Sequence, residues 1–154
     1  MKSLFITLLL LIIITGSFCK ATCQEKMEDY LTEARKFQGE GKIDSAIDIL
    51  NKAIEKDPSF KEAYYMLGNI YITEAYYQKA SEIFKKLHEI LPDDLMIQYL
   101  MAVSDFLSYD YISASKKLEK ILNYNPRDTI SRGYLVLTLS RMGQNDRALG
   151  ELMT

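Results

Sequence analysis

Histidine, cysteine and proline are scarce in this sequence of 154 residues, and tryptophan is absent. His88 is the one histidine, so neither a second histidine nor a cysteine cluster completes the ligand set of a metal site. The sequence also lacks a nucleophile–base pattern and a glycine-rich phosphate loop; Gly39 and Gly41 follow an expected helix rather than a strand and indicate a turn. We therefore expect a protein that is not an enzyme and that holds no cofactor and no metal.

The sequence also has no excess of basic residues over acidic ones. The chain has 19 basic and 21 acidic residues, which gives a net charge of −2. Removal of residues 1–21 would take away Lys2 and Lys20 but no acidic residue, and the net charge would become −4. This balance gives no support to nucleic-acid binding, which needs a basic surface against the phosphates.

One long apolar run is present, and it lies at the N-terminus. Lys2 precedes residues 4–14, which are apolar except for Thr7, and small residues follow at Gly16, Ser17 and Ala21. This order predicts a secretory signal peptide over residues 1–21 and a short N-terminal segment over 22–26. The run is shorter than the ~20 residues of a membrane span, so an uncleaved anchor is the lesser alternative. We expect an exported protein, periplasmic or secreted, with envelope association as a further option.

The two cysteines leave open both the cleavage site and the state of Cys23. Cleavage after Ala21, or alternatively after Cys19, leaves Cys23 alone, so no internal disulfide can form. Cys23 would then lie near the new N-terminus, where bacterial lipoproteins carry a lipidated cysteine. The preceding Lys20-Ala21-Thr22 fits the lipoprotein pattern poorly, since that pattern has leucine three residues before the cysteine and a small residue just before it. Cys23 is therefore either lipidated or a terminal thiol, and we expect membrane contact only through such a lipid or an uncleaved leader.

The remainder of the chain repeats itself with a period of 34 residues. Such a period indicates an array of helical hairpins, each too small to bury its own apolar face. The residues that keep the spacing are Pro58, Pro92 and Pro126, and Ala46, Ala80, Ala114 and Ala148.

The clearest unit, residues 61–94, contains Tyr64-x-x-Leu67-Gly68-x-x-Tyr71, then Ala80-x-x-x-Phe84 and Pro92. This unit resembles the tetratricopeptide repeat in residue type and spacing. Helical periodicity agrees, and a turn near Tyr76-Tyr77 separates two apolar stripes. The stripes are Tyr64, Leu67, Gly68, Tyr71 and Ala75, and Ile83, Phe84, Leu87 and Leu91.

The resemblance covers residues 27–154. It implies repeats at 27–60, 61–94 and 95–128 and a partial fourth at 129–154. The third repeat is degenerate, because Gln98 and Asp105 stand where the family prefers bulky apolar residues. The fold class that we expect is all-α: an α-solenoid of antiparallel helix pairs, the tetratricopeptide superhelix, with seven to eight helices after the leader.

In this family the first helices of successive repeats line a concave groove that binds ligands. The resemblance therefore implies a partner-binding groove that is mostly apolar and aromatic, as protein interfaces are. Some members of the family bind acidic chaperone C-termini with a clamp of lysine, asparagine and arginine. That clamp is absent here, because Arg35 is the only basic residue at the corresponding positions. The implied groove residues are Tyr65, Met66, Asn69, Ile72, Met96, Tyr99, Leu100, Val103, Phe106 and Tyr134, and the fourth unit would also contribute Ile130 and Leu137.

The function that we expect is a non-catalytic scaffold for protein–protein interaction, an adaptor or assembly factor that binds a protein or peptide in this groove. In one alternative the groove side chains pack on one another and the protein is a self-associating structural subunit of an envelope complex. A weaker alternative is a carrier of a small apolar ligand. Leu149, Leu152 and Met153 have no following helix in the sequence to cover them, which suggests a homodimer through this end.

Overall fold

The computed structural model describes residues 27–153. The expected signal peptide and Cys23 lie outside the described residues, so their interpretation stays a prediction. Within residues 27–153, no helix combines the length and the apolar character that a membrane crossing requires.

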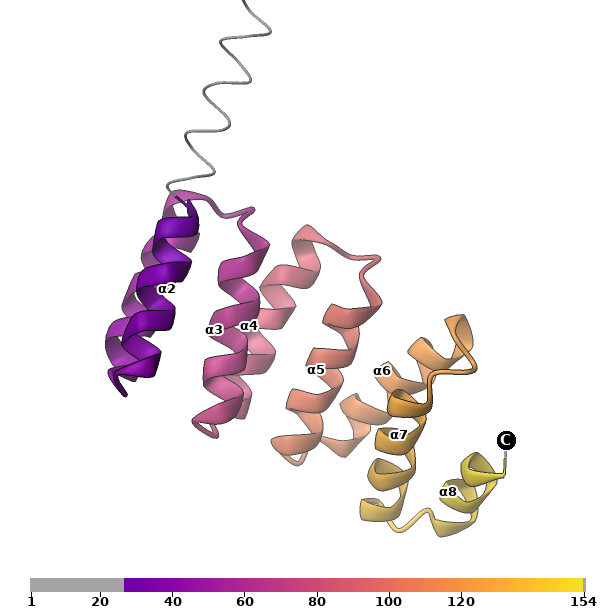
Figure 1. The fold of residues 1–154 in the computed structure, drawn as a ribbon. Coiled ribbons are helices and arrows are strands. Elements are labelled where there is room, and N and C mark those ends of the chain that lie inside the picture. Colours follow the sequence, from indigo (N-terminus) through magenta and orange to yellow (C-terminus); the bar gives the residue numbers. More distant parts are fainter. Residues whose placement is uncertain (1–26, 154) are drawn as a thin grey trace, which may run out of the picture. The chain divides into compact units, whose positions relative to one another are not determined.

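Residues 27–153 form eight helices in sequential antiparallel pairs, as the repeat pattern predicts (Figure 1). The first helix, α1, covers residues 27–39. The others are α2 (Ile43–Lys56), α3 (Lys61–Thr73), α4 (Tyr77–Ile90), α5 (Leu95–Leu107), α6 (Tyr111–Tyr124), α7 (Thr129–Arg141) and α8 (Asn145–Leu152).

The chain divides into two compact units near residue 63, and each has a core of its own. In the first unit, small and branched side chains of α1 and α2 are buried, among them Ala34, Ala46 and Leu50. In the second unit, Leu67, Phe84 and Leu87 are fully buried in the pair α3/α4. A further cluster joins α5 to α8 through Ala102, Leu118, Leu122, Leu135, Leu139 and Ala148.

Each proline of the 34-residue period follows the end of a second helix. Helix α2 ends at Lys56 before Pro58, α4 ends at Ile90 before Pro92, and α6 ends at Tyr124 before Pro126. Proline cannot continue a helix, because it lacks the amide hydrogen and its ring clashes with the preceding turn. This part of the sequence prediction is confirmed.

Each helix pair turns at a residue with a positive φ, and these four residues also keep the 34-residue spacing. Gly41 and Gly143 have φ values of 73° and 74°, whereas Ala75 and Tyr109 have values of 60° and 67°. The prediction that Ala75 belongs to a helical stripe is wrong, because α3 ends at Thr73 and Ala75 lies exposed in the turn. The turn itself is at residues 74–75, slightly earlier than expected, and α4 begins at Tyr77.

The small residue at position 68 lets α3 and α4 approach each other closely. A Cβ atom built on Gly68 would lie 2.3 Å from Cζ of the Phe84 ring. Real Cβ atoms do not come so near to another heavy atom, so glycine is required here for steric reasons. The expected close helix pairing at this place of the repeat is confirmed.

The two polar residues that make the third repeat degenerate are both buried and both hydrogen-bonded. Gln98 is 6 % exposed, and its Nε2 donates to the carbonyl oxygen of Pro92 at 3.3 Å. Asp105, also 6 % exposed, accepts a hydrogen bond from Ser81 Oγ at 2.8 Å and forms an ion pair with Lys117. Asp105 of α5 therefore connects α4 with α6 by polar contacts at a place where other repeats use apolar ones.

Candidate functional site

Five aromatic side chains of α5, α6, α7 and the α5–α6 turn contact one another in a continuous row. The ring centroids are 5.7 Å apart for Tyr99–Tyr134, 5.8 Å for Phe106–Tyr134, 5.6 Å for Phe106–Tyr111 and 6.2 Å for Tyr109–Tyr111. Most of these contacts are edge-to-face, the geometry that the quadrupole of aromatic rings favours. We call these five residues the aromatic row.

The aromatic row contains three of the predicted groove residues, Tyr99, Phe106 and Tyr134, and places them in mutual contact. All three are half-buried, so each ring packs on its neighbours and still presents part of its surface to solvent. Ligand binding and self-packing, which the sequence left as alternatives, are therefore both compatible with this arrangement.

The other predicted groove residues differ in exposure. Val103 is buried, with 8 % of its surface exposed, and Leu100 beside it on α5 is half-buried. Met96 is 58 % exposed at the start of α5. On α3, Asn69 is exposed, whereas Tyr65, Met66 and Ile72 are half-buried. The Tyr65 hydroxyl donates to Asp94 Oδ2 at 3.3 Å, which connects α3 to the residue that caps α5.

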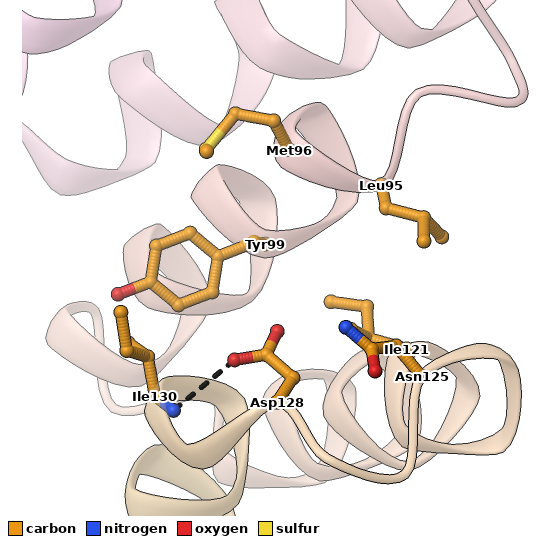
Figure 2. A pocket seen from close by; sticks show the side chains of 7 residues that line it. All are labelled: Leu95, Met96, Tyr99, Ile121, Asn125, Asp128 and Ile130. Carbon is orange, nitrogen blue, oxygen red and sulfur yellow. Dashed lines mark hydrogen bonds between the residues drawn. The ribbon is translucent and has the colours of Figure 1, made fainter.

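A hollow of about 180 Å³ lies beside Tyr99, between the start of α5, the end of α6 and the start of α7. Figure 2 shows the side chains of Met96, Tyr99, Asp128 and Ile130 around it, with the Asp128 carboxylate turned toward its middle. Typical small-molecule sites measure about 300–1,000 Å³, so the hollow suits one amino-acid side chain better than a cofactor. The residues that line it are Leu95, Met96, Tyr99, Ile121, Asn125, Asp128 and Ile130.

Asp128 is the one charged residue among those that line the hollow. It is the N-cap of α7: its Oδ1 accepts the backbone amides of Ile130 and Ser131 at 3.1 and 3.2 Å, and its Oδ2 accepts Ser131 Oγ at 2.8 Å. Burial opposes ionisation, but these hydrogen bonds outweigh it and hold the pKa of Asp128 below its ordinary value. The hollow therefore carries a negative charge at neutral pH.

Tyr99 forms the aromatic wall of the same hollow and stays protonated. Burial raises its pKa to about 12, and the neighbouring Tyr134 and the Asp128 carboxylate act in the same direction. The Tyr99 side chain therefore remains a neutral ring with a hydroxyl group across the physiological pH range.

Four residues of the hollow were not predicted from the sequence, namely Leu95, Ile121, Asn125 and Asp128. Ile121 and Asn125 lie at the end of α6 and Asp128 just before α7, whereas the family-based prediction considered only positions on the first helices. One local feature could have indicated Asp128, because aspartate directly before a helix is a preferred N-cap. Its position beside Tyr99 depends on the packing of α5 against α7, which no local pattern shows.

His88 is half-buried at the end of α4, and its Nδ1 has no hydrogen-bond partner there. Within residues 27–153 no group of three His, Cys, Asp or Glu side chains could hold a metal ion.

Residues 37–103 match the family model of the tetratricopeptide repeat. Small glutamine-rich tetratricopeptide repeat-containing protein 2 of Mycosarcoma maydis is 33 % identical over 75 residues, which are 49 % of this chain and 21 % of that protein. The chain thus spans about a fifth of the length of this curated relative.

Solved structures resemble the fold over most of the chain. A crystal structure of MamA has a TM-score of 0.73 at 22 % identity, covering 81 % of this chain and 68 % of its own. MamA of Desulfovibrio magneticus RS-1 has a TM-score of 0.72 at 15 % identity, covering 82 % and 72 %. YrrB, described as a TPR protein with an unusual peptide-binding site, has a TM-score of 0.65 at 24 % identity, covering 79 % and 63 %.

These matches define the class of the protein as an all-helical repeat protein of paired antiparallel helices. More specifically, residues 37–103 match the tetratricopeptide repeat, in agreement with the motif in residues 61–94, and the fold is that of the tetratricopeptide-like structures. Proteins of this family are scaffolds and typically non-catalytic, in agreement with the expectation that the chain is not an enzyme.

Proposed function

We propose that this protein is a non-catalytic interaction module that binds a protein or peptide across the first helices α3, α5 and α7, as an adaptor or assembly factor. The aromatic row carries this proposal. Half-exposed aromatic rings provide large contact area at low entropic cost, and tyrosine is enriched among the residues that dominate binding energy. Peptide binding by YrrB, which has the same fold, supports the class of ligand.

The surface next to the aromatic row is also apolar and exposed. Met96 is 58 % exposed, Ile130 63 % and Leu137 52 %, and they lie on α5 and α7, as do Tyr99, Phe106 and Tyr134. Large apolar side chains that gather on one face in this way mark interaction sites more often than scattered ones do. The ligand would be extracytoplasmic if residues 1–21 are a signal peptide, and the charged start and apolar run of that segment support export.

One observation favours a second candidate, the self-associating subunit. Leu149 and Leu152 of the last helix and Met153 directly after it are 60 %, 67 % and 82 % exposed. Three neighbouring apolar side chains in one short segment would gain free energy from being covered by a second copy. The small hollow, by contrast, gives no particular support to a carrier of apolar ligands.

Site-specific photo-crosslinking tests the proposal without disturbing the half-buried rings. A benzophenone amino acid replaces Met96, beside the aromatic row, or Tyr124, which is 72 % exposed at the end of α6. The protein is expressed from its full coding sequence in its native host, irradiated and examined by mass spectrometry. We expect an adduct with another polypeptide at position 96 and none at 124.

The other results would each reject part of the proposal. Equal adducts at both positions would contradict a ligand face on α5. An adduct of the protein with itself alone would favour the self-associating subunit.

A further inference from the structure

The hollow beside Tyr99 combines features that seldom occur together on a binding face. Its wall is apolar, from Leu95, Met96, Ile121 and Ile130, yet it contains the Asp128 carboxylate. None of the residues that line the hollow is basic. Arg127, next to Asp128 in the sequence, does not line it. An apolar wall with one negative charge matches a ligand group that is aliphatic along its length and positive at its end.

The carboxylate can accept a further hydrogen bond. Asp128 Oδ2 accepts one bond, from Ser131 Oγ, and a carboxylate oxygen has room for two. The two backbone amides on Oδ1 fix the carboxylate on its helix, so the charge is held in place before a ligand arrives. A cation that binds there does not have to order the acceptor first, which favours binding.

We infer that this hollow receives an arginine or lysine side chain of a bound peptide, with its aliphatic stem against Met96 and Ile130 and its cationic head at the Asp128 carboxylate. This inference rests on the proposed function and specifies the ligand. The Asn125 carboxamide supplies a second oxygen for the head group, and the Tyr99 ring offers a face on which a guanidinium can stack. The occupant is thus a basic segment with apolar neighbours, not an acidic one.

Binding of this side chain would also cover exposed apolar surface. Met96 and Ile130, at 58 % and 63 % exposure, flank the hollow and would be buried by the stem. A purely apolar side chain would bury the same surface but would leave the Asp128 charge without a partner, in a partly dehydrated site. That cost distinguishes the basic residue from its uncharged analogue.

The experiment begins with selection of a phage-displayed random 12-residue peptide library on the protein, expressed from its full coding sequence. We expect the selected peptides to contain arginine or lysine flanked by apolar residues. One such peptide is then synthesised with its basic residue, and again with norleucine, which keeps the stem and removes the charge. Affinities of both peptides are measured by fluorescence anisotropy for wild type and for two variants, Asp128→Asn and Asp93→Asn.

Asp128→Asn removes the charge and keeps the cap, because asparagine is as good an N-cap as aspartate. We expect the basic peptide to bind this variant about tenfold more weakly than wild type, as a charge-assisted hydrogen bond implies. The norleucine peptide should bind Asp128→Asn at least as well as wild type, because the variant has no buried charge to leave without a partner. Asp93→Asn removes an exposed carboxylate outside the hollow and should change neither affinity by more than about twofold, since exposed charges are screened.

The outcomes separate this inference from the proposed function. Selected peptides without basic residues, or a basic peptide that binds Asp128→Asn as well as wild type, would overturn the inference and leave the interaction module standing. Failure to select any peptide that binds the folded protein would contradict the proposed peptide-binding function itself.

Discussion

The backbone at Ala75 and Tyr109 is left-handed, with φ values of 60° and 67°. This conformation costs a residue with a side chain roughly 1–2 kcal/mol, whereas glycine adopts it freely. Gly41 and Gly143 occupy the equivalent places of the other two helix pairs and carry no such cost. The two central turns are therefore strained where the outer ones are not.

Ala75→Gly should stabilise the protein by about 0.5–1 kcal/mol, since relief of the strain exceeds the added entropy of glycine in the unfolded chain. Urea unfolding followed by circular dichroism measures the change. Gly41→Ala is the matched control at the equivalent turn and should destabilise by about 1 kcal/mol. A loss of stability in Ala75→Gly would contradict the left-handed geometry of this turn.

The close contact between Gly68 and Phe84 gives the second prediction at this scale. Gly68→Ala should destabilise by roughly 1–3 kcal/mol, because the added methyl group meets the Phe84 ring in a filled core. Gly133→Ala on α7 is the control, since nothing lies within 4 Å of its Cβ position. It should stabilise by about 0.5–1 kcal/mol through helix propensity alone. Equal effects of the two substitutions in thermal unfolding would argue against the contact.

At the scale of helices, the buried Asp105 determines how α4, α5 and α6 are joined. Its carboxylate accepts from Ser81 and pairs with Lys117, and it is nearly inaccessible to solvent. A buried charge is tolerated when it is paired and is costly when its partner is removed. The polar contacts therefore replace the apolar packing that the family uses at this place.

Lys117→Met should destabilise by about 1–3 kcal/mol, because it leaves the Asp105 carboxylate buried without its cation. The double variant Asp105→Leu with Lys117→Met restores an apolar side chain and should recover most of that loss. The free energy of unfolding of both variants is measured by urea unfolding, with the same m-value for each. A double variant less stable than Lys117→Met would show that the ion pair contributes more than apolar packing could replace.

The sequence predicted the helices better than the contacts between them. Proline spacing predicted where second helices end, and the requirement for a small residue at Gly68 followed from the repeat motif. The strained turn at Ala75 could not be predicted, since alanine has no preference for a positive φ. Asp105 was interpreted only as a departure from the family pattern. Its ion pair with Lys117 could not be predicted, because a buried ion pair depends on side chains of two different helices.

The candidate site, too, could be predicted from the sequence only in part. Tyr99, Phe106 and Tyr134 were predicted on one face because first helices recur with the repeat, and the structure brings their rings together. Asp128 was not predicted as a site residue although its role as the N-cap of α7 is local. Its position in the wall of the hollow depends on where the start of α7 meets α5. Periodicity thus predicts which helix face a residue shares, whereas a hollow at the helix ends requires the packed structure.

At the scale of the whole molecule, two apolar surfaces are candidates for binding another polypeptide: the face around the aromatic row and the exposed side of α8. The face around the aromatic row contains a hollow and a fixed charge, features that select a particular ligand. The exposed side of α8 has the apolar side chains of Leu149 and Leu152. We therefore propose selective recognition at the first surface and self-association, which needs only apolar area, at the second.

The α8 surface predicts a weak homodimer. We expect the mass from light scattering to rise toward twice that of the monomer as concentration increases, since Leu149 and Leu152 lose solvent contact in a dimer. The variant Leu149→Lys with Leu152→Lys should stay monomeric, because it places charges in the contact. Ile112→Lys is the control, since Ile112 on α6 is as exposed as Leu149, 60 % in each case, and its variant should dimerise like wild type. A wild-type protein that is monomeric at every concentration would eliminate the self-associating subunit and leave the aromatic row as the interaction surface of the molecule.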